Sequence, residues 1–196
     1  GFGLLNSSVA EYSRATQLVI MVFMFLCGIS FQVYYLLLMR KPSEILKNEE
    51  LHAYLTIIVG SVILIGINIY SSIQNVGESL FQAGFQVISI ITTTGFSTTD
   101  FNLWPSFSKM IIFLLMIVGA CAGSTGGGFK ISRMIVWIKS IKNEVTSVIH
   151  PRSVKKIHFC GRPLSDDVVH SIRVYLAIFI GIYLVSVLII SLDGHE

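Results

Sequence analysis

The sequence predicts an all-α integral membrane protein. Of its 196 residues 53% are apolar and only 13% charged, the mean hydropathy is +0.75, and four apolar stretches are long enough to cross a bilayer. A soluble globular domain carries about 25% charged residues, so the composition argues against a water-soluble enzyme and against a disordered chain. The net charge of +3 is too small to indicate a nucleic-acid partner.

The four apolar stretches are the expected membrane spans. A hydrocarbon core of about 30 Å needs roughly 20 helical residues at a rise of 1.5 Å each. Residues 16–39 and 53–73 contain no charge and are expected to be the first and second spans. Residues 107–138 form the third, interrupted by glycines between 123 and 128, and residues 174–192 form the fourth.

A fifth apolar segment, residues 79–91, is too short to span. Its 13 residues measure about 20 Å as a helix. Gln82, Gln86 and Ser89 recur at helical spacing among its apolar residues. Non-helical backbone at membrane depth requires shielding by protein or by a water-filled cavity. We therefore expect a re-entrant helix that enters and leaves on one side of the membrane.

The basic residues orient the spans. Twelve of the fourteen Lys and Arg residues lie within 40–52 and 130–173, and only Arg14 and Lys109 lie elsewhere. Cytoplasmic loops carry the excess of Lys and Arg. We therefore expect 40–52 and 130–173 in the cytoplasm, and the Thr-rich residues after 92 on the outer side.

A weak internal repeat supports this arrangement. A shift of 94 residues places Gly1-Phe2 on Gly95-Phe96, Cys27 on Cys121 and Ser30 on Ser124. A shift of 121 residues places Tyr54-Leu55 on Tyr175-Leu176. The repeated unit would be an outer helix, a re-entrant helix, a Gly-Phe loop and an inner helix, and such internal repeats are common in transporters.

The candidate ion site is the Thr-rich segment, residues 92–99, with the sequence TTTGFSTT. It follows the C-terminal end of the short helix, where the helix dipole favours a cation. An extended run here can turn successive carbonyl oxygens towards one axis, where they replace the hydration shell of K⁺, and Gly95 permits the backbone torsions that this needs. An ordinary Ser/Thr-rich external loop is the alternative.

The second candidate is the Gly-rich loop, residues 119–130. A phosphate-binding P-loop would need Lys directly after Gly128, where Phe129 stands, and no strand precedes the loop. Glycines break helices in membranes, so we expect a polar loop near the middle of the bilayer that obstructs a pore beneath the Thr-rich segment and moves aside. Close helix packing through small residues is the alternative.

The remaining features are less specific. Three cysteines, two of them in apolar runs, do not form a disulfide framework, and the five histidines show no metal-ligand spacing. No nucleophile–base pair indicates an enzyme. The basic segment 143–169 could dock a soluble partner or anionic lipid, or be a plain solvated loop.

The Thr-Thr-Thr-Gly-Phe and Gly-Ser-Thr-Gly-Gly-Gly-Phe-Lys strings together resemble the Trk/Ktr/HKT potassium transporters, and the TrkH-type membrane subunit most closely. The resemblance implies helix–pore-helix–helix units around a pseudo-fourfold axis, each giving one glycine to the filter. Residues 1–41 would end the second unit, 50–142 form the third, 143–169 be a basic cytoplasmic loop and 170–196 start the fourth.

The resemblance also assigns residues and partners. Thr93, Thr94, Gly95 and Phe96 would form one wall of a K⁺ filter, with Gly1 as the filter remnant of the previous unit. The gating loop would comprise Ala122, Gly123, Ser124, Thr125, Gly126, Gly127 and Gly128. The family implies a homodimer in the bacterial inner membrane, in contact with lipid, and a cytosolic nucleotide-binding regulatory subunit of the TrkA/KtrA type that meets 143–169. No organic cofactor is expected.

We therefore predict a fragment of a potassium-uptake protein. K⁺ is the expected ion and Na⁺ the other candidate, with channel and coupled transport, including symport, both open. The alternatives are a small cation channel formed by oligomers of this chain and a membrane scaffold without transport activity.

Overall fold

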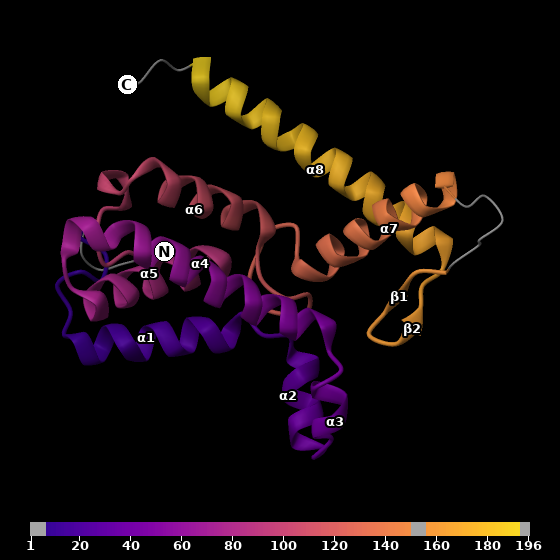
Figure 1. Cartoon of the computed structure of the whole chain (residues 1–196), viewed down its shortest axis with the longest axis horizontal. Helices are drawn as coiled ribbons and strands as arrows, with labels where there is room; N and C mark the ends of the chain where they lie inside the picture. The colour runs from indigo at the N-terminus through magenta and orange to yellow at the C-terminus, as the bar shows by residue number, and fades with distance from the viewer. Residues whose placement is uncertain (1–6, 150–155, 193–196) are drawn as a thin grey trace. The chain divides into compact units, whose positions relative to one another are not determined.

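The computed structural model describes residues 7–149 and 156–192, which are helical apart from one short β-hairpin and the connecting loops (Figure 1). The all-α prediction is thus confirmed. The chain divides into two compact units, residues 1–132 and 133–196. Unit one contains α1 (Arg14–Cys27), α2 (Phe31–Leu38), α3 (Pro42–Ile45), α4 (Glu49–Ile73), α5 (Val76–Ile91), the 3-10 helix η1 (Phe101–Leu103), α6 (Ser106–Val118) and the first residues of α7 (Ile131–Ile149). Unit two contains the rest of α7, β1 (His158–Phe159), β2 (Arg162–Pro163) and α8 (Asp166–Leu192).

Polar side chains fix where the helices of unit one begin. The Asn48 side chain accepts hydrogen bonds from the amides of Glu50 (3.0 Å) and Leu51 (3.1 Å) and caps α4. Asn75 caps α5 by accepting from the Glu78 amide at 3.2 Å. Such caps satisfy amides that have no partner inside the helix. Because Gln74 ends α4 in the left-handed conformation (φ 55°), the chain turns directly into α5.

The core of unit one is built around α5. This helix packs against α4, α6 and α1, and buried residues lie on all its sides, among them Ala83, Phe85, Val87 and Ile91. Its 16 residues measure about 24 Å, too short to cross a hydrocarbon core. The sequence predicted a shorter helix, 79–91, and the start lies three residues earlier because Asn75 is the cap.

The first apolar stretch is not one continuous span, which corrects the expectation for 16–39. Helices α1 and α2 meet at an angle of 89° across residues 28–30, called here the first break (Figure 1). The Ser30 side chain accepts from the Gln32 amide at 3.3 Å and starts a new helix. Among the described residues, α4 and α8 are long and apolar enough to cross a membrane, and the bent pair would make a third span.

The third apolar stretch is broken, as predicted, but the break is longer than residues 123–128. Helix α6 ends at Val118 after 13 residues, and α7 begins only at Ile131. Gly119, at φ 72° and ψ −171°, ends α6 in a conformation that residues with a Cβ rarely adopt. The whole Gly-rich loop is therefore non-helical.

Unit two is more ordered than the expected basic loop at 143–169. Helix α7 continues to Ile149, the hairpin pairs His158 with Pro163, and α8 begins at Asp166 rather than near 174. Two acidic residues in the first turn of α8 favour this early start, because they complement the helix dipole. Arg173 forms an ion pair with Glu144 and donates from Nε to the Ser140 hydroxyl at 2.9 Å, which joins α8 to α7.

Gly28 in the first break should tolerate no side chain. A Cβ there would collide with the Tyr54 hydroxyl and would lie 2.8 Å from Cγ2 of Thr92. We expect Gly28→Ala to lower the free energy of unfolding by about 1–3 kcal/mol through overpacking. Denaturant unfolding of the protein in detergent micelles measures this change.

Gly60 in α4 provides the control, because a Cβ there meets nothing within 4 Å. Gly60→Ala should leave the stability unchanged or raise it by up to about 1 kcal/mol, as helix propensity predicts. Equal stability of the two variants would show that the packing around Gly28 is not tight.

Candidate functional site

The Thr-rich segment folds back onto the end of α5. The amides of Thr92 and Thr93 donate to the carbonyls of Ile88 (3.1 Å) and Ile90 (3.0 Å), and those of Thr94 and Gly95 both donate to the Ser89 carbonyl (2.9 and 3.3 Å). Thr93 (φ 57°) and Gly95 (φ 78°) adopt positive φ to make these bonds. The first residues of the segment therefore form turns and do not run extended as the sequence predicted, because their amides satisfy the last carbonyls of α5.

Side chains fix the segment further along. Ser89, which is fully buried, donates from its hydroxyl to the Phe96 carbonyl at 2.6 Å. The hydroxyls of Thr92 and Thr94 lie 2.9 Å apart. The Ser97 amide donates to the Ser8 hydroxyl at 3.1 Å, and the Val9 amide donates to the Ser97 carbonyl at 3.3 Å. Thr93, Thr94, Gly95 and Phe96 thus form one ordered segment, whereas Gly1 lies outside the described residues.

The Gly-rich loop crosses itself at two glycines. A Cβ on Gly119 would lie 2.5 Å from the Gly127 carbonyl oxygen, and a Cβ on Gly128 would lie 2.8 Å from Cα of Gly119. Gly128 also has a positive φ of 81°. Two bonds close the crossing, from the Phe129 amide to the Ile117 carbonyl (3.2 Å) and from the Lys130 amide to the Val118 carbonyl (2.9 Å). Only glycine fits at this crossing.

The middle of the Gly-rich loop contacts the Thr-rich segment. The Gly127 amide donates to the Thr93 hydroxyl at 2.7 Å. A Cβ on Gly126 would lie 3.1 Å from the Thr92 carbonyl oxygen, so these two backbones are in close contact. The Lys130 ammonium donates to the Gly126 carbonyl. The two sequence motifs, which residues 100–118 separate in the chain, therefore meet at one place in unit one.

The Gly-rich loop also pairs with the first break. The Phe31 amide donates to the Gly123 carbonyl at 3.1 Å, and the Cys121 amide donates to the Gly28 carbonyl at 3.2 Å. The Thr125 hydroxyl donates to the Cys27 carbonyl at 3.3 Å. The residues that the 94-residue shift aligns, Cys27 with Cys121 and Ser30 with Ser124, thus lie at or beside these two contacting breaks.

Two residues of α4 complete the site, and the sequence analysis missed both. Glu50 is only 7% exposed, and its Oε1 accepts from the amides of Ala122 (2.6 Å) and Ser132 (3.1 Å). Tyr54, one turn later and fully buried, donates from its hydroxyl to the Phe25 carbonyl at 3.0 Å. The acidic pair directly before a charge-free span was the available signal for Glu50, but it reads equally as an ordinary first turn.

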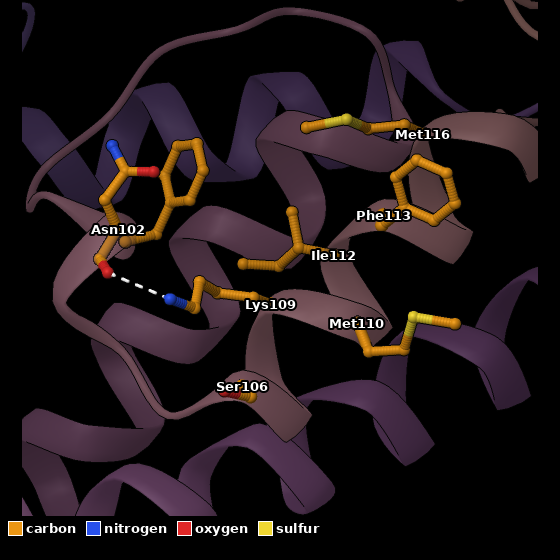
Figure 2. Close-up of a pocket in the computed structure, with 8 residues that line it drawn as sticks. Asn102, Ser106, Lys109, Met110, Ile112, Phe113 and Met116 are labelled. Carbon is orange, nitrogen blue, oxygen red and sulfur yellow. Dashed lines mark hydrogen bonds between the residues drawn. The ribbon is translucent and has the colours of Figure 1, made fainter. Parts of the chain in front are cut away.

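Two other hollows lie outside the contact between the Thr-rich segment and the Gly-rich loop, although Thr98 of the segment lines the second of them. A groove of about 470 Å³ lies along α6, and Lys109 Nζ donates there to the Asn102 carbonyl at 3.3 Å. Figure 2 shows Met110, Phe113 and Met116 among its lining side chains. None of its lining residues belongs to the Thr-rich segment or the Gly-rich loop. A polar pocket of about 270 Å³ contains the Arg14–Glu78 ion pair, with Arg14 stacked over the Phe81 ring.

Comparison with known proteins gives a consistent result. Residues 1–195 match the family TrkH, described as cation transport protein. The chain is 27% identical over 203 residues to the Trk system potassium uptake protein TrkH of Salmonella typhimurium, and 24% identical over 199 residues to TrkG of Escherichia coli K12. Both alignments cover the whole chain, which spans 41% of each relative's length.

A solved structure shows the same fold. The crystal structure of the potassium transporter TrkH from Vibrio parahaemolyticus superposes on the whole chain with a TM-score of 0.90 and 28% sequence identity. The chain covers 43% of that structure. The helical architecture of the chain is therefore that of this transporter fold.

Ser89 should be important for the conformation of the Thr-rich segment. Ser89→Ala removes the hydroxyl that binds the Phe96 carbonyl, and loss of such a buried bond costs about 1–3 kcal/mol. We expect a drop of this size in the free energy of unfolding, measured in detergent micelles. Ser71→Ala is the control, because Ser71 is exposed on α4 and its bond to the Asn68 carbonyl is 3.4 Å long. An equally small effect of both changes would contradict this role.

Proposed function

Because the chain belongs to the TrkH family of cation transport proteins, we propose that it forms part of a potassium-uptake pathway, with residues 93–96 as one wall of the ion filter. The relatives it matches are named potassium uptake proteins. The observation that carries the proposal is the contact between the Gly-rich loop and the Thr-rich segment at the end of a buried helix too short to span.

The local chemistry suits a dehydrated cation. The C-terminal end of α5 carries a partial negative charge. Because the amides of residues 92–95 all donate back to α5, they do not point a positive group at an ion. No charged side chain lies between Glu78 and Asp100, so carbonyl oxygens would hold the ion weakly enough to release it. Na⁺ is the competing ion in any test.

The Gly-rich loop is our proposed gate. Residues 122–128 would obstruct the ion path beside the filter and open it by leaving Thr92 and Thr93. In support, the loop is a long non-helical segment held by individual hydrogen bonds, such as that from the Gly127 amide to the Thr93 hydroxyl. Its glycines at positive φ, Gly123 and Gly128, allow backbone rearrangement at low steric cost.

We further propose a homodimer in the bacterial inner membrane, with a cytosolic nucleotide-binding regulatory subunit that contacts 143–169. In support, the last turns of α7 expose the apolar residues Ile141, Val145, Val148 and Ile149 at helical spacing. Such a stripe on a basic cytoplasmic segment fits a docking helix.

Gly95 provides the test of the filter. Its φ of 78° is unfavourable for a β-branched residue, so Gly95→Val should distort the filter wall. We expect Rb⁺ uptake by the full-length protein, expressed in a strain deficient in K⁺ uptake, to fall at least about tenfold or to lose its preference over Na⁺. Gly181→Val in α8 is the control, because a Cβ there meets nothing within 4 Å. Intact uptake and preference in Gly95→Val would refute the filter assignment.

A reversible cross-link tests the gate. A Cβ on Gly127 would lie 3.9 Å from Cβ of Thr93, within the 3.5–4.5 Å that a disulfide requires. We expect the double variant Thr93→Cys/Gly127→Cys to form this bond on oxidation and to lose at least about nine-tenths of its Rb⁺ uptake, which reductant should restore. The native cysteines Cys27, Cys121 and Cys160 are first replaced by Ala.

The two single-cysteine variants are the controls for this cross-link. Oxidant should leave their uptake unchanged, because neither can form the bond. If the double variant cross-links fully and Rb⁺ uptake continues at the original rate, the Gly-rich loop is not the gate.

A further inference from the structure

We propose that Glu50 is a positioning residue that keeps the Gly-rich loop seated against the Thr-rich segment by binding both ends of the loop. This inference rests on the proposed gate and names the group that holds it closed. Glu50 lies on α4, outside both sequence motifs, so its role depends on contacts that only the folded chain makes.

One carboxylate oxygen serves both ends of the loop. Oε1 accepts from the Ala122 amide at 2.6 Å and from the Ser132 amide at 3.1 Å. Gly126 and Gly127, the loop residues in contact with Thr92 and Thr93, lie between these two amides. Neither amide has a helical partner to replace Glu50, since Ala122 lies in the non-helical loop and Ser132 in the first turn of α7.

The N-terminal end of α7 favours a hydrogen-bond acceptor at this position. Helix α7 has 19 residues and begins at Ile131, and its N-terminal end carries a partial positive charge. Glu50 is 7% exposed, so water competes little for its oxygens.

The helix that carries Glu50 is itself firmly held. Asn48 caps α4 through the amides of Glu50 and Leu51. One turn beyond Glu50, the buried Tyr54 bonds to the Phe25 carbonyl and stacks on the Phe25 ring at 5.7 Å between centroids. The first two turns of α4 thus contact both broken helices, and Glu50 acts from a fixed point.

If Glu50 acts by bridging two amides, the length of its side chain matters more than its charge. Gln keeps an amide oxygen at the distance of Oε1 and can accept from both amides. Asp keeps the charge but is one methylene shorter, so its carboxylate cannot reach both amides from the same backbone position. Ala removes the acceptor. A buried negative charge that served only the stability of the fold would give the opposite order, with Asp better than Gln.

The experiment makes two measurements on each Glu50 variant of the full-length protein. The first is the disulfide yield after brief oxidation, measured with the Thr93→Cys/Gly127→Cys pair present. The second is basal Rb⁺ uptake, measured in the matching protein without cysteines. We expect E50A and E50D to reduce the cross-link yield at least about threefold and to raise basal Rb⁺ uptake at least about threefold, while E50Q stays within about 1.5-fold of the parent. E44A is the control, because Glu44 is exposed on α3 and pairs with Lys41, the residue before that helix. It should change neither measurement.

The outcomes separate the two proposals. If deletion of residues 126–128 raises Rb⁺ uptake but E50A and E50D do not, the Glu50 inference is wrong and the gate stands. If the deletion leaves uptake unchanged, the gate itself is wrong. If E50A does not reach the membrane, the comparison of E50D with E50Q tests the inference. A cross-link yield that is lower in E50Q than in E50D overturns it.

Discussion

Two backbone hydrogen bonds, from Phe31 to Gly123 and from Cys121 to Gly28, join the breaks of two helices, and the close backbone contacts of the candidate site depend on this pairing. A helix that stops among apolar surroundings exposes amides and carbonyls, and each unpaired group costs several kcal/mol there. One broken helix can therefore persist only where another segment supplies partners. The first break and the Gly-rich loop supply them to each other.

This pairing explains where glycine is required. Gly28 lies against Tyr54 and Thr92, and Gly119 and Gly128 lie against each other, so a Cβ at any of the three would collide with a neighbour. The close backbone contacts then place Gly126 beside the Thr92 carbonyl. Small residues thus serve two purposes in this chain, because they allow the helices to break and they allow the broken ends to meet.

A continuous series of contacts runs from α4 to the Thr-rich segment. Glu50 binds both ends of the Gly-rich loop, Gly127 in the middle of the loop binds Thr93, and the amides around Thr93 bind the end of α5. In this series the Gly-rich loop and the Thr-rich segment both lack regular secondary structure, but the first amides of the segment are bonded to α5. A movement between the two helices would therefore be concentrated in the loop, which agrees with its proposed role as a gate.

The sequence by itself determined the features that depend on neighbouring residues. Hydropathy predicted the all-α membrane class, the length of 79–91 predicted a helix too short to span, and the glycines after 119 predicted a broken third stretch. The motif strings correctly indicated the TrkH family. The orientation of the spans from Lys and Arg and the roles of Gly95 and residues 122–128 stay predictions.

Only the tertiary structure revealed that 16–39 is bent by 89°, that Thr93 lies in a turn with positive φ, and that Glu50 is buried under the loop. The bend and the burial of Glu50 each depend on a partner far along the chain, 72 residues away for Glu50 and Ala122, and hydrogen bonds over such separations leave no local pattern in the sequence. The conformation at Thr93 depends instead on bonds to the nearby carbonyls of Ser89 and Ile90, which form only once α5 has folded.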